Sequence, residues 1–200
     1  MPQFRGQNYA AFLFDMDGTM VDSSVVVERV WREWAERHGV DPATVLAACH
    51  GVRSEDLVKR FAPTGIEVSG EVAVILAAEV ADIEGVVPVE GIGALIESLD
   101  PGRWAVVTSA PRQLAEVRLR AAGIPLPKVL IAAEDVERGK PDPQGFQKAA
   151  ALLGVPVTAC LVFEDSHAGI AAAKAAGAQV AIVGKLAAEV EGHHALVDYR

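Results

Sequence analysis

The sequence has little cysteine, and it also lacks the pattern of a secreted protein. Its two cysteines, Cys49 and Cys160, are far apart and form no CxxC spacing. Neither a disulfide framework nor a cysteine-ligated zinc site is therefore predicted. The first 15 residues do not combine a charged start with a long apolar stretch, which is the pattern of a signal peptide. We expect reduced thiols and a cytoplasmic protein.

Positive charge and long apolar runs are also scarce. The chain has 18 Lys and Arg residues against 27 Asp and Glu residues, a net charge of −9, and no basic cluster. Nucleic acids and anionic membranes bind basic surfaces, and a membrane span needs about 18 consecutive apolar residues. We therefore expect neither nucleic acid nor membrane as a partner. An anionic substrate requires a local cation that overcomes the general negative field.

Residues 21–87 show the pattern of helices alone. The whole chain has 200 residues, of which 51% are hydrophobic, enough for one domain or for a core domain with a modest insertion. Apolar residues follow helical spacing over residues 22–39. Trp31 and Trp34 are predicted to lie in the core of this segment or at its interface with the rest of the chain, rather than to form a platform on which a sugar stacks. Three more helices are predicted, from residue 42 onwards and over residues 54–61 and 69–84. No strand is convincing, so the segment is predicted to be an inserted helical module.

The rest of the chain alternates between strands and helices. Apolar strands are predicted over residues 9–14, 104–107, 129–131, 160–163, 180–183 and 195–197. Helices are predicted between them, over residues 92–99, 111–122, 142–153 and 166–177. Strands that are apolar throughout are typical of a parallel sheet with both faces covered. The fold class is therefore predicted to be α/β, with a Rossmann-like parallel sheet core (1–20 and 88–200) and an inserted small α-helical cap domain (21–87).

Strong polar groups gather at the predicted strand ends. In an open parallel sheet, ligands bind beyond the carboxyl ends of the strands. The groups that stand there or in the adjoining loops are Asp15, Asp17, Thr108, Ser109, Lys140, Glu164 and Asp165. One or two such placements are expected by chance, but this many are not. We therefore predict a single site at this edge of the sheet.

The charges of this site indicate its chemistry. Asp15, Asp17 and Asp165 at about 4 Å from one another would repel by roughly 4 kcal/mol per pair, so they need a cation. Oxygen ligands suit Mg²⁺, and Mg²⁺ with Lys140 would supply the positive charge that a phosphate needs. Thr108, with the neighbouring serine and helix amides, could bind the phosphoryl oxygens. One carboxylate can act as nucleophile and another as general acid and base.

Four sequence motifs occur in an order that resembles a known family. They are FDMDGT (14–19), VVTSA (106–110), GKPDP (139–143) and FEDSHAGIAAAKAAG (163–177). The ordered set resembles the haloacid dehalogenase-like hydrolase superfamily, in particular its phosphatases with a helical cap after the first strand. The resemblance implies that Asp15 is the nucleophile and Asp17 the general acid and base. Members that dehalogenate lack the second aspartate, so Asp17 favours phosphate chemistry.

The same resemblance implies roles for the remaining motif residues. Mg²⁺ would be held by Asp15, by the backbone carbonyl of Asp17 and by Asp165. Glu164 would reach the ion through water or by holding its ligands. The resemblance also implies that Thr108 and Lys140 hold the transferring phosphoryl group, with Lys140 stabilising Asp15 as well.

The segment over residues 27–53 resembles the cap of a narrower group, the hexitol phosphatase and 2-deoxyglucose-6-phosphatase type. This implies a small phosphorylated sugar or polyol as substrate. In that group a cap loop faces the active site, and here the loop is residues 49–53. His50 and Arg53 are the residues expected to contact the substrate, together with Ser109 of the core. We expect a monomer or a weak dimer.

Three of these assignments leave a second interpretation open. Ser109 has the geometry of a helix cap as well as of a phosphate ligand. His50 ends a helix beside a glycine, where a histidine often acts as a C-terminal cap. Arg53 is equally well placed to pair with Glu55 or Asp56 on a solvated face.

Two other functions compete with hydrolysis. A phosphosugar mutase shares the core and the cap but has a histidine ten residues beyond the second aspartate, where this chain has Val27. The second alternative is a signalling receiver that accepts phosphate on an aspartate. Its acidic cluster is similar, but the Asp-x-Asp spacing and the inserted cap do not suit it. Both points favour the phosphatase.

Overall fold

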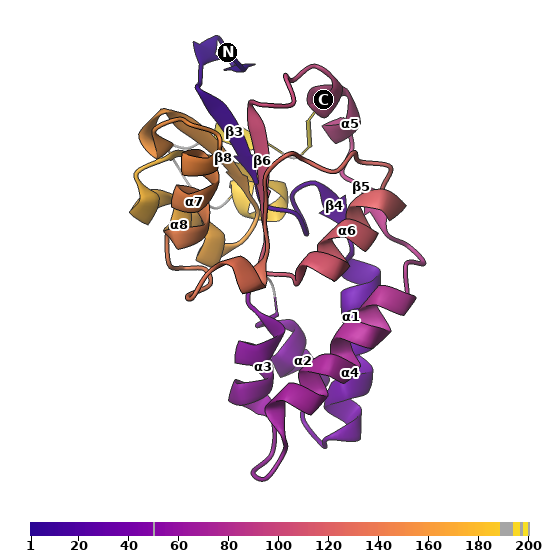
Figure 1. Ribbon diagram of the computed structural model, residues 1–200. Helices are drawn as coiled ribbons and strands as arrows, with labels where there is room; N and C mark the ends of the chain where they lie inside the picture. Colours follow the sequence, from indigo (N-terminus) through magenta and orange to yellow (C-terminus); the bar gives the residue numbers. More distant parts are fainter. Residues whose placement is uncertain (50, 189–193, 197, 200) are drawn as a thin grey trace.

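The computed structural model describes residues 1–49, 51–188, 194–196 and 198–199. Figure 1 shows an α/β part around a sheet and a group of helices at one end of it. This arrangement confirms the predicted Rossmann-like core with helices inserted after its first long strand. The exact division into a core (1–20 and 88–200) and a cap (21–87) stays a prediction. Below, "the cap" means residues 21–87.

The sheet has six parallel strands in the order β10-β9-β8-β3-β6-β7. Their bounds are β3 (Ala11–Phe14), β6 (Trp104–Val107), β7 (Leu130–Ile131), β8 (Cys160–Glu164), β9 (Gln179–Val183) and β10 (His194–Leu196). Each lies within or close to a predicted strand, and the parallel sheet is confirmed. Residue 197, at the end of the last predicted strand, is outside the described residues. Strands β3, β6 and β8 are buried along their whole length, as strands covered on both faces must be.

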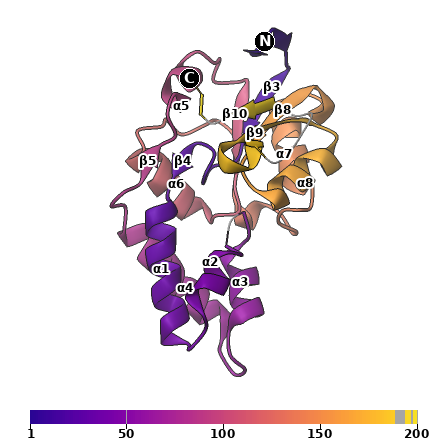
Figure 2. The same ribbon diagram turned by 180° about the vertical axis from the view of Figure 1, so that it is seen from behind.

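Helices cover both faces of the sheet, as Figures 1 and 2 show. Phe12 and Phe14 of β3 face one cluster, to which α5 and α6 contribute, and Leu13 faces the other, with α7 and α8. The bounds are α5 (Ile92–Glu97), α6 (Arg112–Ala121), α7 (Gln144–Leu152) and α8 (His167–Ala176), with short 3₁₀ turns at Ala133–Asp135, Val157–Ala159 and Gly184–Ala188. The two-residue alternation of a strand thus divides the core into two layers.

Four helices make up most of the cap. They are α1 (Ser24–Arg37), α2 (Pro42–Leu46), α3 (Ser54–Phe61) and α4 (Val68–Ala81). The side chain of Asp41 caps α2, and Pro42 lies in the first turn of this helix. Trp31 and Trp34 are buried and lie edge to face with ring centroids 5.5 Å apart. They form part of the cap interior, as predicted.

Two short strand pairs were missing from the sequence prediction. Strand β4 (Val21–Asp22) pairs antiparallel with β5 (Val87–Pro88), so the prediction that residues 21–87 contain no strand is wrong at both of its ends. A hairpin of β1 (Gln3–Phe4) and β2 (Gln7–Asn8) also precedes the sheet. Two-residue strands are too short to show periodicity, so the sequence carries no signal for them. The β4–β5 pair ties together the two connections between core and cap.

Among the described residues, no helix is both long and apolar enough to cross a membrane.

Trp34 provides a test of the cap interior. It has no exposed surface, and its Nε1 donates a 3.0 Å hydrogen bond to Glu71 of α4. We expect Trp34→Ala to lower the free energy of unfolding by about 3–5 kcal/mol, measured by urea denaturation. The matched control is Val25→Ala on the same helix, half exposed at 51%, which should cost about 0.5 kcal/mol or less. Equal effects of the two variants would contradict this packing.

Candidate active site

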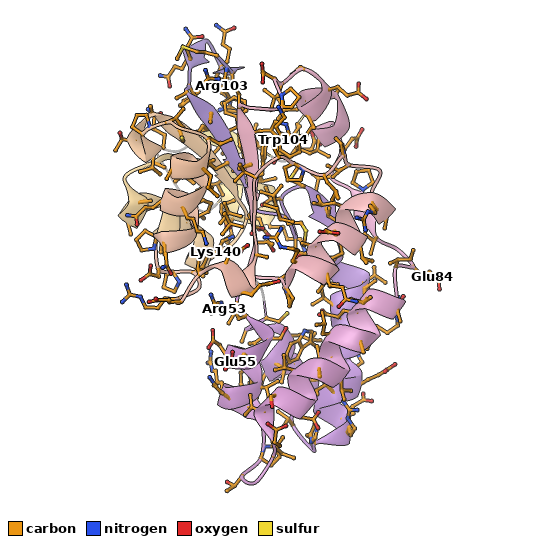
Figure 3. All side chains as sticks on the ribbon, in the orientation of Figure 1. Arg53, Glu55, Glu84, Arg103, Trp104 and Lys140 are labelled. Atoms are coloured by element: carbon orange, nitrogen blue, oxygen red, sulfur yellow. The ribbon has the colours of Figure 1, made fainter. Side chains whose placement is uncertain are left out.

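Asp15, Lys140 and Glu164 form a buried ion-pair group at the carboxyl end of the sheet. Phe14 of β3 is in register with Phe163 of β8, so the residues that follow them emerge side by side. The Lys140 ammonium contacts Asp15 Oδ1 and lies 2.5 Å from Glu164 Oε1. The Lys140 side chain is 5% exposed. The structure therefore brings Asp15 together with two groups that lie more than 120 residues further along the chain. Figure 3 shows Lys140 in the core above the cap.

The negative charge here exceeds what Lys140 neutralises. Carboxylate oxygens of Asp15, Glu164 and Asp165 all lie within 4.8 Å of one another. Burial raises the pKa of Asp15 well above its ordinary range, although Lys140 lowers it. Burial and the neighbouring Glu164 raise the pKa of Asp165 to about 7. A divalent cation with a preference for oxygen ligands fits this donor set, because it would offset the surplus charge and keep the carboxylates ionised.

The loop after β3 is shaped to bring these carboxylates close. Gly18 has φ +82°, and a Cβ added to it would lie 1.9 Å from Asp165 Oδ2. Only glycine adopts this backbone conformation readily and leaves the space free. The hydroxyl of Thr19 donates a 3.2 Å hydrogen bond to Asp165 Oδ1. The DGT part of the motif therefore positions Asp165.

Glu164 is held on both sides. Besides contacting Lys140, it accepts hydrogen bonds of 2.9 Å from the backbone N–H and from the hydroxyl of Ser166. Gly169 lies so close that a Cβ there would be 1.6 Å from Glu164 Oε1. The first turn of α8 is thus fitted around this carboxylate. Its expected role at the metal, through water or through the other ligands, stays a prediction.

The carboxylate of Asp17 has a different environment. Its Oδ1 accepts a 2.6 Å hydrogen bond from the Ser23 hydroxyl and lies 2.9 Å from Nη1 of Arg118. It is not part of the acidic cluster in the described residues, and the expected metal contact through its backbone carbonyl stays a prediction. Sequence reasoning missed Arg118, because an arginine in an amphipathic helix gives no sign of a partner 101 residues away.

Thr108 and Ser109 follow β6, as predicted, but differ in their contacts. Thr108 is 6% exposed, and its hydroxyl oxygen accepts a 3.0 Å hydrogen bond from the backbone N–H of Ala110. The Ser109 hydroxyl donates a 2.9 Å hydrogen bond to the backbone oxygen of Gly51 in the cap. Helix α6 has no side-chain cap, so Ser109 does not act as its cap here. It links core and cap.

Arg53 also links the two parts. Its Nη2 donates hydrogen bonds of 2.9 Å to the backbone oxygens of Ala133 and Val136, and a Cβ at Gly139 would lie 2.6 Å from its Nε. Figure 3 shows Arg53 at the junction of core and cap. Among the described residues it forms no ion pair with an acidic neighbour of its own helix. Its contact with substrate stays a prediction, and so does that of His50, which lies outside the described residues.

A concave region joins several of these residues. It is lined by Thr108, Ser109 and Lys140 of the core and by Arg53 of the cap. The predicted phosphoryl-binding residues and the predicted cap contact therefore border one space. All predicted site residues that the structure describes lie at this end of the sheet.

The chain is similar to several known proteins. A family model described as haloacid dehalogenase-like hydrolase matches residues 9–177. The chain is 39% identical to hexitol phosphatase A of Escherichia coli K12, over 86% of this chain and 82% of that protein. It is 36% identical to 2-deoxyglucose-6-phosphate phosphatase 2 of Saccharomyces cerevisiae, over 89% and 80%. Among solved structures, β-phosphoglucomutase of Clostridium difficile has a TM-score of 0.83 at 20% identity, covering 96% of this chain and 91% of that one, which shows the fold alone.

Gly18 allows a direct test of the cation site. We expect Gly18→Ala to displace the Asp165 carboxylate and to weaken binding of Mg²⁺ at least about tenfold, a loss typical of a disturbed ligand shell. The measurement is the rise in melting temperature during a Mg²⁺ titration. Gly6→Ala is the matched control, because Gly6 has φ +79° with nothing within 4 Å of an added Cβ. Equal Mg²⁺ responses of the two variants would contradict the proposed site.

Proposed function

The chain belongs to the haloacid dehalogenase-like hydrolase family, and we propose that it is a phosphatase that hydrolyses small sugar or sugar-alcohol phosphates. The observation that carries the chemistry is the buried Asp15 carboxylate, paired with Lys140 beside Asp165 and Glu164. The substrate class is supported by the names of the relatives, a hexitol phosphatase and a 2-deoxyglucose-6-phosphate phosphatase. We further propose Mg²⁺ as the cofactor and an aspartyl phosphate as the intermediate.

In the first step the Asp15 carboxylate attacks the phosphorus atom. A bond forms between phosphorus and a carboxylate oxygen, and the bond from phosphorus to the sugar oxygen breaks. Asp17 gives its proton to the departing alkoxide, so that the sugar leaves as a neutral alcohol. Lys140 keeps the nucleophile ionised by direct contact and offsets the negative charge of the phosphoryl oxygens.

In the second step a water molecule hydrolyses the aspartyl phosphate. Asp17, now ionised, takes a proton from the water as its oxygen attacks phosphorus. The bond from phosphorus to Asp15 breaks, which releases phosphate and restores both carboxyl groups. One aspartate therefore serves as acid and then as base, and this requires it to stand near the nucleophile without being part of the metal cluster.

Mg²⁺, when bound by Asp15, Asp165 and the carbonyl of Asp17, would neutralise the charge of the phosphoryl oxygens and lower the repulsion that the attacking carboxylate meets. Thr108 is suited to bind one phosphoryl oxygen. Its oxygen already accepts a hydrogen bond from Ala110, and its proton is donated to no other described residue. The hydroxyl hydrogen is thus available to the substrate.

The cap would enclose the leaving group. Gly51 and Arg53 of the cap contact the core next to Lys140, so a sugar attached to the phosphate would meet the loop over residues 49–53. Closure of such a cap excludes bulk water while the alcohol is still bound. The choice among sugars is therefore proposed to depend on this loop, including His50 and Arg53.

The two alternatives are less well supported. A phosphosugar mutase would need a group in place of Val27 that protects the aspartyl phosphate, and none is available at that position. The fold similarity to a β-phosphoglucomutase is at 20% identity and carries no argument about activity. A signalling receiver would have no use for a cap of four helices.

Asp15→Asn tests the nucleophile. We expect the wild-type protein to release phosphate steadily from one or more hexose or hexitol phosphates with Mg²⁺. The variant should be slower by more than about 1,000-fold, as for other covalent nucleophiles. Asp56→Asn is the matched control, an exposed aspartate on α3, and it should keep full activity. Substantial Mg²⁺-dependent turnover by Asp15→Asn would show that the nucleophile is another group.

Removal of the metal gives a second test. We expect chelation to abolish phosphate release and Mg²⁺ to restore it. Asp165→Asn should need roughly 10–100 times more Mg²⁺ for half-maximal activity, because it loses a charged ligand. The measurement is initial rate against free Mg²⁺ concentration. Full activity in the presence of chelator would remove Mg²⁺ from the mechanism.

A further inference from the structure

Arg118 stands at the centre of a buried charge network that the mechanism above does not use. Arg118 lies on α6 and is only 3% exposed. It is not a member of the acidic cluster, which consists of Asp15, Glu164 and Asp165 in the described part of the chain. Nη1 lies 2.9 Å from Asp17 Oδ1, and Nη2 lies 3.1 Å from Glu79 Oε1. Glu79 belongs to α4 of the cap and is itself 4% exposed. One guanidinium therefore joins the loop after β3 to a helix of the cap.

We propose that Arg118 is a positioning residue for Asp17, and that Glu79 of the cap fixes Arg118 in the orientation this requires. The proposal rests on the proposed function, since it concerns the acid and base of that reaction. It assigns a role to two residues that touch neither the phosphoryl group nor the metal cluster.

The contacts of Asp17 show what is being positioned. Its Oδ1 accepts from both the Ser23 hydroxyl and Arg118, while Oδ2 has no hydrogen-bond partner among the described residues. With Oδ1 held at two points, Oδ2 is the oxygen left to carry the proton. A carboxylate fixed by two donors keeps one rotamer, which proton transfer at hydrogen-bond distance requires.

Because Arg118 and Glu79 are buried, each of these charges needs its partner. Burial raises the pKa of Glu79, and the Arg118 guanidinium opposes that rise. A planar fork with fixed N–H directions can pair with two carboxylates at once, whereas a lysine ammonium is a compact charge on a flexible stem. Arg118 Nε has no hydrogen-bond partner in the described part of the chain, so the polar contacts that orient the guanidinium are those with the two carboxylates.

The network also connects Asp17 to the cap. Figures 1 and 2 show α6 next to α4, at the end of the sheet that faces the cap. Ser23 lies just before α1, and Glu79 lies near the end of α4, so both connections between core and cap contribute. A shift of the cap would move Glu79 relative to α6. The position of the acid and base is thus coupled to the position of the cap.

The test needs a variant that folds without the network. Arg118→Met combined with Glu79→Met replaces the buried ion pair by apolar side chains of similar length, an exchange that proteins often tolerate. Arg120→Met is the matched control, since Arg120 is an exposed arginine on the same helix that pairs with Glu116. Melting temperature and circular dichroism establish that each variant is folded.

The measurement compares the activity of each variant on two substrates whose leaving groups differ in their need for a proton. For a sugar phosphate, we expect the double variant to lose roughly 30–100-fold in kcat, with KM within about threefold of wild type. For p-nitrophenyl phosphate, whose leaving group departs without a proton, formation of the aspartyl phosphate should stay fast. Its hydrolysis still needs Asp17 as base. A burst of one nitrophenolate per enzyme should therefore precede slow turnover.

Two further variants separate positioning from general damage. Arg118→Lys keeps the positive charge but not the planar guanidinium with its two N–H directions. Its kcat for the sugar phosphate should therefore lie between those of wild type and the double variant. Glu79→Gln keeps a hydrogen-bond acceptor for Arg118 and should lose less than about fivefold in kcat. If the double variant does not fold, the burst with Arg118→Lys decides the question.

The results separate a failure of the role proposed for Arg118 from a failure of the proposed phosphatase function. Equal losses on both substrates without a burst, or wild-type rates in the double variant and in Arg118→Lys, would overturn the role of Arg118 and leave the phosphatase intact. A wild-type protein that releases no phosphate from any substrate would instead overturn the proposed function. The control Arg120→Met should match wild type on both substrates.

Discussion

The contact of Lys140 with Asp15 is the interaction on which the rest of the site depends. The carboxylates of Asp15, Glu164 and Asp165 stand within 4.8 Å of one another, the first two buried and the third half-buried, and a single ammonium cannot neutralise them. Lys140 keeps the group together in the folded protein, and the remaining negative charge makes the site suited to a divalent cation. A phosphate can approach a protein of net charge −9 only where such cations outweigh the general field.

The surrounding fold serves this concentration of charge. Three adjacent strands, β6, β3 and β8, end at the same edge of the sheet and carry Thr108, Asp15 and Glu164 to one place. Gly18 and Gly169 remove the side chains that would separate the carboxylates from the backbone around them. The cap then contacts this edge through Gly51 and Arg53. The strand order, the two glycines and the cap contacts thus all meet at the acidic cluster.

Much of the fold and of the site could be predicted from the sequence because both depend on local sequence patterns. Apolar strands and the polar residues at their ends predict a parallel sheet and its functional edge, and the order of the motifs predicts the family. The pairing of Arg118 with Asp17 and Glu79 was not predictable, because it depends on how α6 and α4 rotate against each other. The β4–β5 pair was missed for another reason, since two residues show no periodicity. The bond from Ser109 to Gly51 likewise depends on where the cap sits.

In the proposed mechanism, Asp15 becomes covalently phosphorylated during turnover. The most direct measurement is a single turnover with a hexitol phosphate carrying radioactive phosphorus, quenched in acid within milliseconds and followed by peptide mapping. We expect acid-stable label on the peptide that contains Asp15, appearing before free phosphate and decaying as phosphate is released. Labelled phosphate that appears without any labelled protein, or label on a peptide without Asp15, would contradict it.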